Sequence, residues 1–238
     1  MRIIPRLDVK NDKLVKTICL EGLRKIGDPN QYARTYANDG ADELLFMDIV
    51  ASLYGRNNLF EIIYNISKDI FIPLTVGGGI RSVKDGIKLL ENGADKVAIN
   101  SATFINNNLI SDLANQIGSS SVVLSIEAKK INDDWYAFYN SGRENSKIKV
   151  IDWIQEGINK GAGEIFLTSV DKEGTENGFD LDLLHRIKLL NIKKPLIISG
   201  GIRDREDIID ANNIINISAV GVASILHYKK KKINELRI

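Results

Sequence analysis

Residues 72 to 85 read IPLTVGGGIRSVKD, and residues 194 to 207 read KPLIISGGIRDRED. Each stretch is a short apolar run followed by glycines, an Ile-Arg pair and a polar start that suits a helix. Two further pairs are related in the same way: GADELLF (40–46) with GAGEIFL (161–167), and, with a slip of one residue, VAINSA (97–102) with VGVASI (220–225). The offsets are all about half of the 238-residue chain. A repeat of this length predicts two similar half-barrels, about residues 1–118 and 119–238.

Short apolar runs recur along the whole chain, separated by amphipathic stretches. The runs are RIIPRLDV, ELLFMDI, IPLTV, DKVAIN, VVLSIE, EIFLTS, PLIIS and AVGVA. Strands that alternate with helices indicate a parallel sheet, and continuously apolar strands indicate that helices cover it. Because no Pro/Ser-rich linker divides the chain, we predict one α/β domain over residues 1–238, a (β/α)₈ TIM barrel.

Composition and charge exclude several classes of protein. Lys plus Arg (32) nearly equals Asp plus Glu (31), so the net charge of +1 gives no reason to expect nucleic acid or a membrane surface as partner. Cys19 is the only cysteine, and the chain does not open on a signal-like apolar segment. We therefore expect a cytoplasmic protein.

The opening of the chain carries a carboxylate at a repeated position. LDVK near the N-terminus aligns with IEAK in the second half, so Asp8 and Glu127 end equivalent strands. In this fold, catalytic groups lie at the C-terminal ends of strands. Two carboxylates on opposite walls of one barrel mouth can act as general acid and base on a substrate between them. Alternatively, each orders its own loop or pairs with Lys10 or Lys129.

The glycine turns predict two anion sites. Each turn leaves a strand and enters a helix, so backbone N–H groups and a helix N-terminus can converge on a phosphate. We call these turns, with the residues that follow the neighbouring strands, the first cup (Gly78, Gly79, Asn100, Ser101) and the second cup (Gly200, Gly201, Ala223, Ser224). Tight turns need glycine in any case, but two related cups predict a ligand with a phosphate at each end.

Charged residues of alternating sign fall near the starts of four strands: Arg2, Glu43, Lys96 and Glu164. At the opposite end of the barrel from the mouth they would pair in a ring. Such a ring either closes the barrel bottom as a salt-bridge network or gates a small molecule that enters from beneath.

The two histidines and the segment after the fifth apolar run are weaker candidates for a functional site. His185 and His227 have no second His or Cys at ligand spacing, so we expect no metal, and no cofactor. The segment KINDDWYAFYNSGRENSKIK alternates as a small hairpin does, and it is either a lid over the mouth or an insertion with its own small core.

With these motifs in order, the sequence resembles the cyclase subunit of imidazole glycerol phosphate synthase, a lyase of histidine biosynthesis. The similarity covers nearly the whole chain through LDVK, DELLFMDI, PLTVGGGIRS, GADKVAIN, GAGEIFLTS and DKEGT. The resemblance implies a barrel that binds a bisphosphorylated ribulosyl substrate. It also implies a heterodimer in which a class I glutaminase docks at the N-terminal face of the barrel and supplies ammonia.

The resemblance also assigns residues. It makes Asp8 and Glu127 the acid/base pair and Arg2, Glu43, Lys96 and Glu164 the ammonia gate. It extends substrate binding beyond the two cups to further positions of the mouth: Lys16, Thr168 and Gly174.

Some features depart from this family. Its second carboxylate is aspartate, whereas this chain has the longer Glu127. The first loop, VKTICLEGLRKIGDP, lacks the glycine that usually follows its lysine, and little chain remains for an eighth helix. These features resemble a paralogous branch that passes ammonia to an enzyme making acetamidino groups on bacterial surface sugars. A non-catalytic scaffold that activates its glutaminase is a further alternative, whereas the four-charge ring disfavours the related isomerase, which needs no ammonia.

Overall fold

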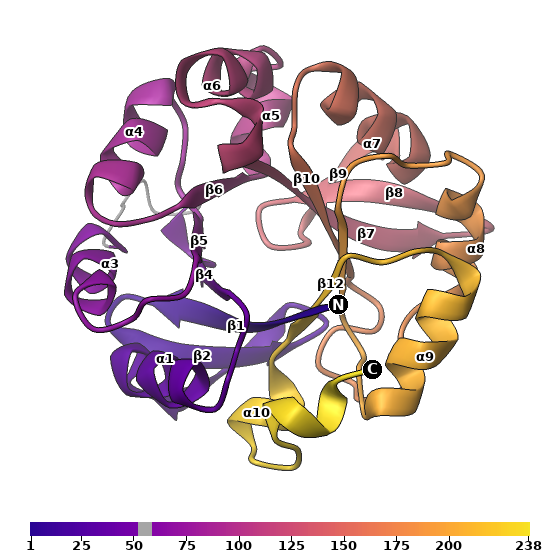
Figure 1. Ribbon diagram of the computed structural model, residues 1–238. Coiled ribbons are helices and arrows are strands. Elements are labelled where there is room, and N and C mark those ends of the chain that lie inside the picture. Colours follow the sequence, from indigo (N-terminus) through magenta and orange to yellow (C-terminus); the bar gives the residue numbers. More distant parts are fainter. Residues whose placement is uncertain (52–58) are drawn as a thin grey trace.

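The computed structural model describes residues 1–51 and 59–238, and its centre is a closed barrel of parallel strands. Helices form a ring around these strands (Figure 1). The barrel strands are β1 (Arg2–Lys10), β4 (Leu44–Asp48), β5 (Leu74–Gly77), β6 (Lys96–Ile99), β7 (Val122–Ile131), β10 (Glu164–Ser169), β11 (Leu196–Ser199) and β12 (Ala219–Val222). The predicted (β/α)₈ barrel is therefore confirmed, with a strand at each of the eight apolar runs.

The barrel closes through parallel pairing of β7 with β10 and of β1 with β12. Its order is β1, β4, β5, β6, β7, β10, β11, β12, so three strands separate β1 from β7 in either direction. The two strands that end in the candidate carboxylates therefore lie on opposite walls.

The helices follow the strands in the alternation that the sequence predicts. They are α1 (Pro29–Asn38), α3 (Leu59–Ser67), α4 (Val83–Glu91), α5 (Ser101–Ile105), α6 (Leu109–Ile117), α7 (Val150–Asn159), α8 (Leu181–Lys188), α9 (Arg205–Ile214) and α10 (Ser224–His227), with 3₁₀ turns at Ser119–Ser121 and Ile233–Leu236. Asp28 caps α1 by accepting from the N–H of Asn30, and Pro29 occupies its first turn. The last α-helix, α10, has only 4 residues.

Two antiparallel hairpins extend the barrel sheet at the mouth. β2 (Lys13–Ile18) and β3 (Glu21–Gly27) continue from β1, and β8 (Asp134–Tyr139) and β9 (Glu144–Lys149) continue from β7. The second hairpin is the one that the alternation in the sequence predicts. The first is a finding of the structure, because the first loop had no predicted strands.

The core has an outer layer and an inner layer, as period-2 strands covered by helices require. On β1, Leu7 and Val9 join the large cluster beneath the helices. Ile4 points the other way, into an apolar layer inside the barrel that also contains Leu45, Ala98, Val123, Phe166, Ile197 and Ala219. This inner layer separates the charged ring below from the polar mouth above.

Candidate functional site

Strand alternation directs both candidate carboxylates to the inside of the barrel. Ile4 of β1 and Val123 of β7 belong to the inner apolar layer, and Asp8 and Glu127 follow them at even spacing on the same faces. Because β1 and β7 lie across the barrel from each other, the two carboxylates project into one mouth from opposite walls. The arrangement is suited to proton transfer at both sides of a bound molecule.

Glu127 is partly buried in this mouth, and its neighbours come from the β8–β9 hairpin. The backbone N–H of Gly142 donates to Glu127 Oε2 at 2.7 Å. Burial raises the pKa of Glu127 to about 7, although the Gly142 N–H and the side chain of Asn100 both favour the charged form. A carboxyl with this pKa exchanges a proton readily near neutral pH, as a catalytic acid or base must.

Asp8 lies in a different environment, in contact with an arginine. Asp8 is 1% exposed, and Arg6 Nε donates to Asp8 Oδ1 at 2.7 Å. Arg6 Nη1 also donates to Thr168 Oγ1 at 3.2 Å. Among the described residues, Asp8 Oδ2 is buried and has no hydrogen-bond partner. Arg6 was missed by the sequence analysis, although its place two residues before Asp8 puts it on the same face of β1.

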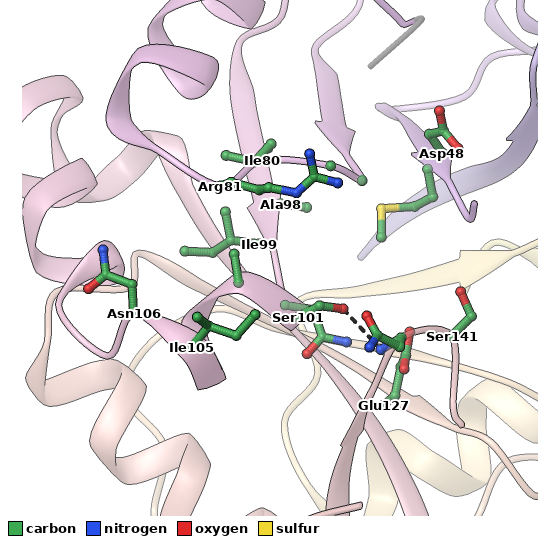
Figure 2. Close-up of a pocket in the computed structure, with 16 residues that line it drawn as sticks. Asp48, Ile80, Arg81, Ala98, Ile99, Ser101, Ile105, Asn106, Glu127 and Ser141 are labelled. Atoms are coloured by element: carbon green, nitrogen blue, oxygen red, sulfur yellow. Dashed lines mark hydrogen bonds between the residues drawn. The ribbon is translucent and has the colours of Figure 1, made fainter. Parts of the chain in front are cut away.

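The first cup is a hollow of about 180 Å³, and the structure brings all four of its predicted residues together there. Gly78 and Gly79 line it from the turn after β5, and Asn100 and Ser101 line it from the start of α5. Glu127 lines the same hollow (Figure 2), so an anion in the cup would lie on the same side of the mouth as this carboxyl.

The β8–β9 turn forms part of the wall of the first hollow. Asn140 and Ser141 line it, and the backbone N–H of Asn140 donates to Ser101 Oγ at 3.0 Å. Ser141 Oγ donates to the carbonyl oxygen of Ile49 at 2.7 Å, across the mouth. The tip of the hairpin therefore covers part of the mouth, which supports the reading of this segment as a lid.

The second cup is a smaller hollow of about 20 Å³. The predicted residues that line it are Lys16, Gly174, Gly200, Gly201, Ala223 and Ser224. Gly200 has a φ of +99°, and a Cβ at this position would approach Ser169 O to 2.6 Å. The turn therefore needs glycine for backbone reasons alone, and the evidence for an anion site is the convergence of the other residues.

Lys16 is held by a residue that the sequence analysis did not single out. Lys16 is 2% exposed; its Nζ donates to the carboxylate of Glu173 and to Thr17 O, the latter at 2.8 Å. Glu173 also accepts from the N–H of Leu20 at 3.0 Å and from Thr17 Oγ1 at 3.2 Å. Glu173 thus fixes the β2–β3 hairpin to the loop after β10. In the sequence, Glu173 could have been identified from its place in the DKEGT motif.

The four-charge ring is closed at the other end of the barrel. Arg2 donates to Glu43 at 2.7 Å and to Glu164 at 2.8 Å, while Lys96 donates to Glu43 at 3.1 Å and to Glu164 at 2.9 Å. Thr75 Oγ1 donates to the second oxygen of Glu43 at 2.5 Å. Each cation therefore bridges both carboxylates, directly beneath the inner apolar layer.

The two histidines lie outside this site. His227 is 3% exposed, accepts from the Tyr36 hydroxyl at 2.6 Å and lies 3.1 Å from the carbonyl oxygen of Arg6, to which it donates. Burial lowers the pKa of His227 to about 4, so the ring is neutral at pH 7. His185 lies in the last turn of α8. Within residues 1–51 and 59–238, no group of three or more His, Cys, Asp or Glu side chains is placed to hold a metal ion.

The helices of the described residues are too short or too polar to cross a membrane.

Comparison with known proteins identifies a family. Residues 2–232 match the family described as "Histidine biosynthesis protein". The imidazole glycerol phosphate synthase subunit HisF of Legionella pneumophila is 53% identical over 208 residues, which are 87% of this chain and 98% of that protein. The HisF subunits of Hydrogenobaculum sp. (strain Y04AAS1) and Flavobacterium psychrophilum are each 43% identical over 238 residues, and the matches cover 99% and 100% of this chain and 94% of each of those proteins.

Proposed function

Because the chain belongs to the histidine biosynthesis protein family and matches HisF subunits over nearly its whole length, we propose that it is the cyclase subunit of an imidazole glycerol phosphate synthase. In this proposal the barrel is a carbon–nitrogen lyase that closes an imidazole ring with ammonia on a bisphosphorylated ribulosyl substrate. The observation that carries the proposal is the facing pair of Asp8 and Glu127 in a mouth that also holds both cups.

The two carboxylates have different surroundings, which suits different roles. Glu127, with a pKa raised by burial to about 7, exchanges protons near neutral pH. Asp8 is held by Arg6 through one oxygen and keeps the other without a protein partner. Two carboxylates in one site can act as acid and base when their surroundings differ.

The two cups supply the proposed phosphate sites. In the first, the backbone after β5 and the N-terminus of α5 are open to a hollow. We predict that phosphate or sulfate at millimolar concentration occupies one or both cups near Gly79 and Gly201. Crystals soaked in phosphate provide the measurement. Well-ordered mouths without anion density at either cup would contradict a bisphosphorylated ligand.

We further propose that a glutaminase docks at the N-terminal face and delivers ammonia through the ring. The turns that lead into β5 and β11 lie on this face and present Phe71 and Leu189, which are 92% and 79% exposed. A partner subunit that covered the whole face would remove both side chains from water. In this proposal ammonia crosses the inner apolar layer above the ring, whose side chains carry no hydrogen-bonding groups.

A substitution in the ring distinguishes a role as ammonia gate from a purely structural role. Glu164→Ala removes the carboxylate that both Arg2 and Lys96 contact, so the ring loses half of its bridges. We expect use of glutamine nitrogen to fall more than use of free ammonium, because only the first must cross the ring. Steady-state rates with the two nitrogen sources, in the presence of the glutaminase, provide the test. An equal loss with both would mark the ring as purely structural.

The names of the curated relatives favour histidine biosynthesis over ammonia delivery to surface-sugar modification. The test of the activity itself is direct. Purified chain given the bisphosphorylated ribulosyl substrate and an ammonium salt should consume the substrate without any partner. A conduit or a scaffold would leave it unchanged.

A further inference from the structure

A buried arginine lies on the wall of the mouth beside the second cup, and neither the motifs nor the proposed acid/base pair account for it. Arg6 is 6% exposed and lies on the inner face of β1 between Ile4 and Asp8. His227 donates to its backbone carbonyl, and its guanidinium lies over the ring of Phe166 at 5.8 Å. The charge is therefore fixed just above the inner apolar layer.

The guanidinium has donors that the protein does not use. Arginine carries five N–H donors in a fixed planar fork. Nε donates to Asp8 and Nη1 to Thr168, whereas within the described residues Nη2 donates to no protein group. Nη2 is not among the fully buried atoms that lack a partner, so it is accessible to water or a ligand. Arg6 lines the hollow of the second cup together with Gly200, Gly201 and Ser224.

The other charged side chains of this hollow are paired, as Arg6 is with Asp8. Lys16 is bound by Glu173 and by a backbone carbonyl. Glu176, which also lines the hollow, pairs with Lys230 at 2.6 Å. Lys16 keeps one N–H of its ammonium and Arg6 keeps its Nη2 group without an acceptor among the described residues, and of the two only Arg6 offers a planar fork to an anion.

The two glycine turns differ in where their arginines lie. Each glycine turn carries an arginine two residues after its last glycine: Arg81 in the first and Arg203 in the second. Arg81 lines the first hollow. Arg203 instead bonds Asp207 at 2.8 Å and lines a separate surface hollow. The second hollow is therefore not lined by the arginine of its own turn, whereas Arg6 from β1 does line it.

We propose that Arg6 is a specificity-determining residue of the second cup: it binds a phosphate monoester group there through Nη2 while Nε and Nη1 keep Asp8 and Thr168 in place. The inference deepens the proposed function, on which it rests for the identity of the substrate. The planar fork, rather than a point charge, is what allows one side chain to hold a carboxylate and a phosphate together.

The test measures binding of inorganic phosphate by calorimetry in a background with the first cup blocked. Ser101→Glu provides that background, because it places a carboxylate in the first cup. In this background Arg6→Met should weaken phosphate binding by about tenfold or more, since a hydrogen bond to a charged group is lost. Arg6→Lys should lie between, and the matched control Arg203→Met should bind as the background does. Equal binding by Arg6→Met, or no phosphate binding by the background, would overturn the proposal.

A second variant keeps the test valid if Arg6→Met does not fold, because that change leaves Asp8 buried without its partner. Arg6→Met with Asp8→Asn removes both charges of the pair. In the same Ser101→Glu background, it should bind phosphate about tenfold more weakly than Asp8→Asn alone. Equal affinity of these two variants would show that Arg6 serves only to pair with Asp8.

Phosphate binding requires no turnover, so the two proposals fail separately. Arg6-dependent phosphate binding by a protein that leaves the ribulosyl substrate unchanged would overturn the cyclase assignment alone. Normal turnover with an unchanged KM in Arg6→Met would overturn the role of Arg6 alone.

Discussion

Glu127→Gln is expected to lower kcat/KM for ring closure by roughly 10² to 10⁴-fold, the usual contribution of a positioned proton-transfer group. Glutamine keeps the shape of the side chain and can still accept from Gly142, whose N–H now donates to Glu127 Oε2 at 2.7 Å. The change therefore removes the exchangeable proton while it preserves the packing. Asp8→Asn should have an effect of similar size. The exposed Glu91→Gln on α4 is the control, with an unchanged rate.

The pH dependence of kcat/KM identifies the role of Glu127. Burial raises its pKa from 4.5 to about 7. As a general acid it must carry its proton, so activity should fall as pH rises through about 7; as a general base it must be charged, so activity should fall as pH drops through the same value. Glu127→Gln should remove that limb of the profile. A variant rate within threefold of the wild type, with the limb intact, would exclude Glu127 from proton transfer.

Glu127→Asp tests the length of the side chain separately. Aspartate has one methylene less, and a displacement of about 1 Å at a reacting group can change a rate on the order of a hundredfold. If Glu127 transfers a proton at its present side-chain length, the shorter aspartate should lower activity or leave it little changed. A large gain instead would indicate that the longer side chain had weakened the chemistry.

Glu173→Ala is expected to have the largest effect on stability, about 3 to 5 kcal/mol, because it leaves the buried ammonium of Lys16 without its carboxylate. It also removes the acceptor of the Leu20 N–H, so the β2–β3 hairpin loses its attachment to the loop after β10. We expect the midpoint of denaturant unfolding to fall and KM for the substrate to rise.

Glu176→Ala is the matched control for this prediction. Glu176 lies in the same loop and pairs with Lys230, whose side chain is 54% exposed. Exposed pairs contribute about 0 to 1 kcal/mol, so the unfolding midpoint of this variant should stay close to that of the wild type. Equal small losses in both variants would show that Glu173 does not hold the hairpin.

The barrel was predictable because its signals are local and repeated. Each strand is a short apolar run with its own glycine or polar stop, and the repeat sets the number of units. The β2–β3 hairpin was not predictable in the same way. Its turn places Cys19 and Leu20 at positive φ, and it is held by the Cys19 N–H bond to Glu173 O at 2.8 Å. Because this bond joins two residues far apart in the sequence, the residues of the loop alone do not indicate it.

The site shows the same division. The glycine turns and the charged ring follow from the repeat and from strand starts, and the structure brings the members of each group together. Arg6 and Glu173 matter only after the barrel closes, because their partners Thr168 and Lys16 lie more than 150 positions away along the chain. Strand alternation from Asp8 alone would have placed Arg6 inside the barrel, but not beside the second cup.

The most direct test of the central claim is the fate of ¹⁵N-ammonium in a reaction with the purified chain and the bisphosphorylated ribulosyl substrate. If the chain is the cyclase, the wild type should form imidazole glycerol phosphate with ¹⁵N in its ring at about 1 per second or faster, as is usual for enzymes, and Asp8→Asn or Glu127→Gln should form little product. Unchanged substrate with the wild-type chain, or equal label incorporation by both carboxylate variants, would contradict that claim.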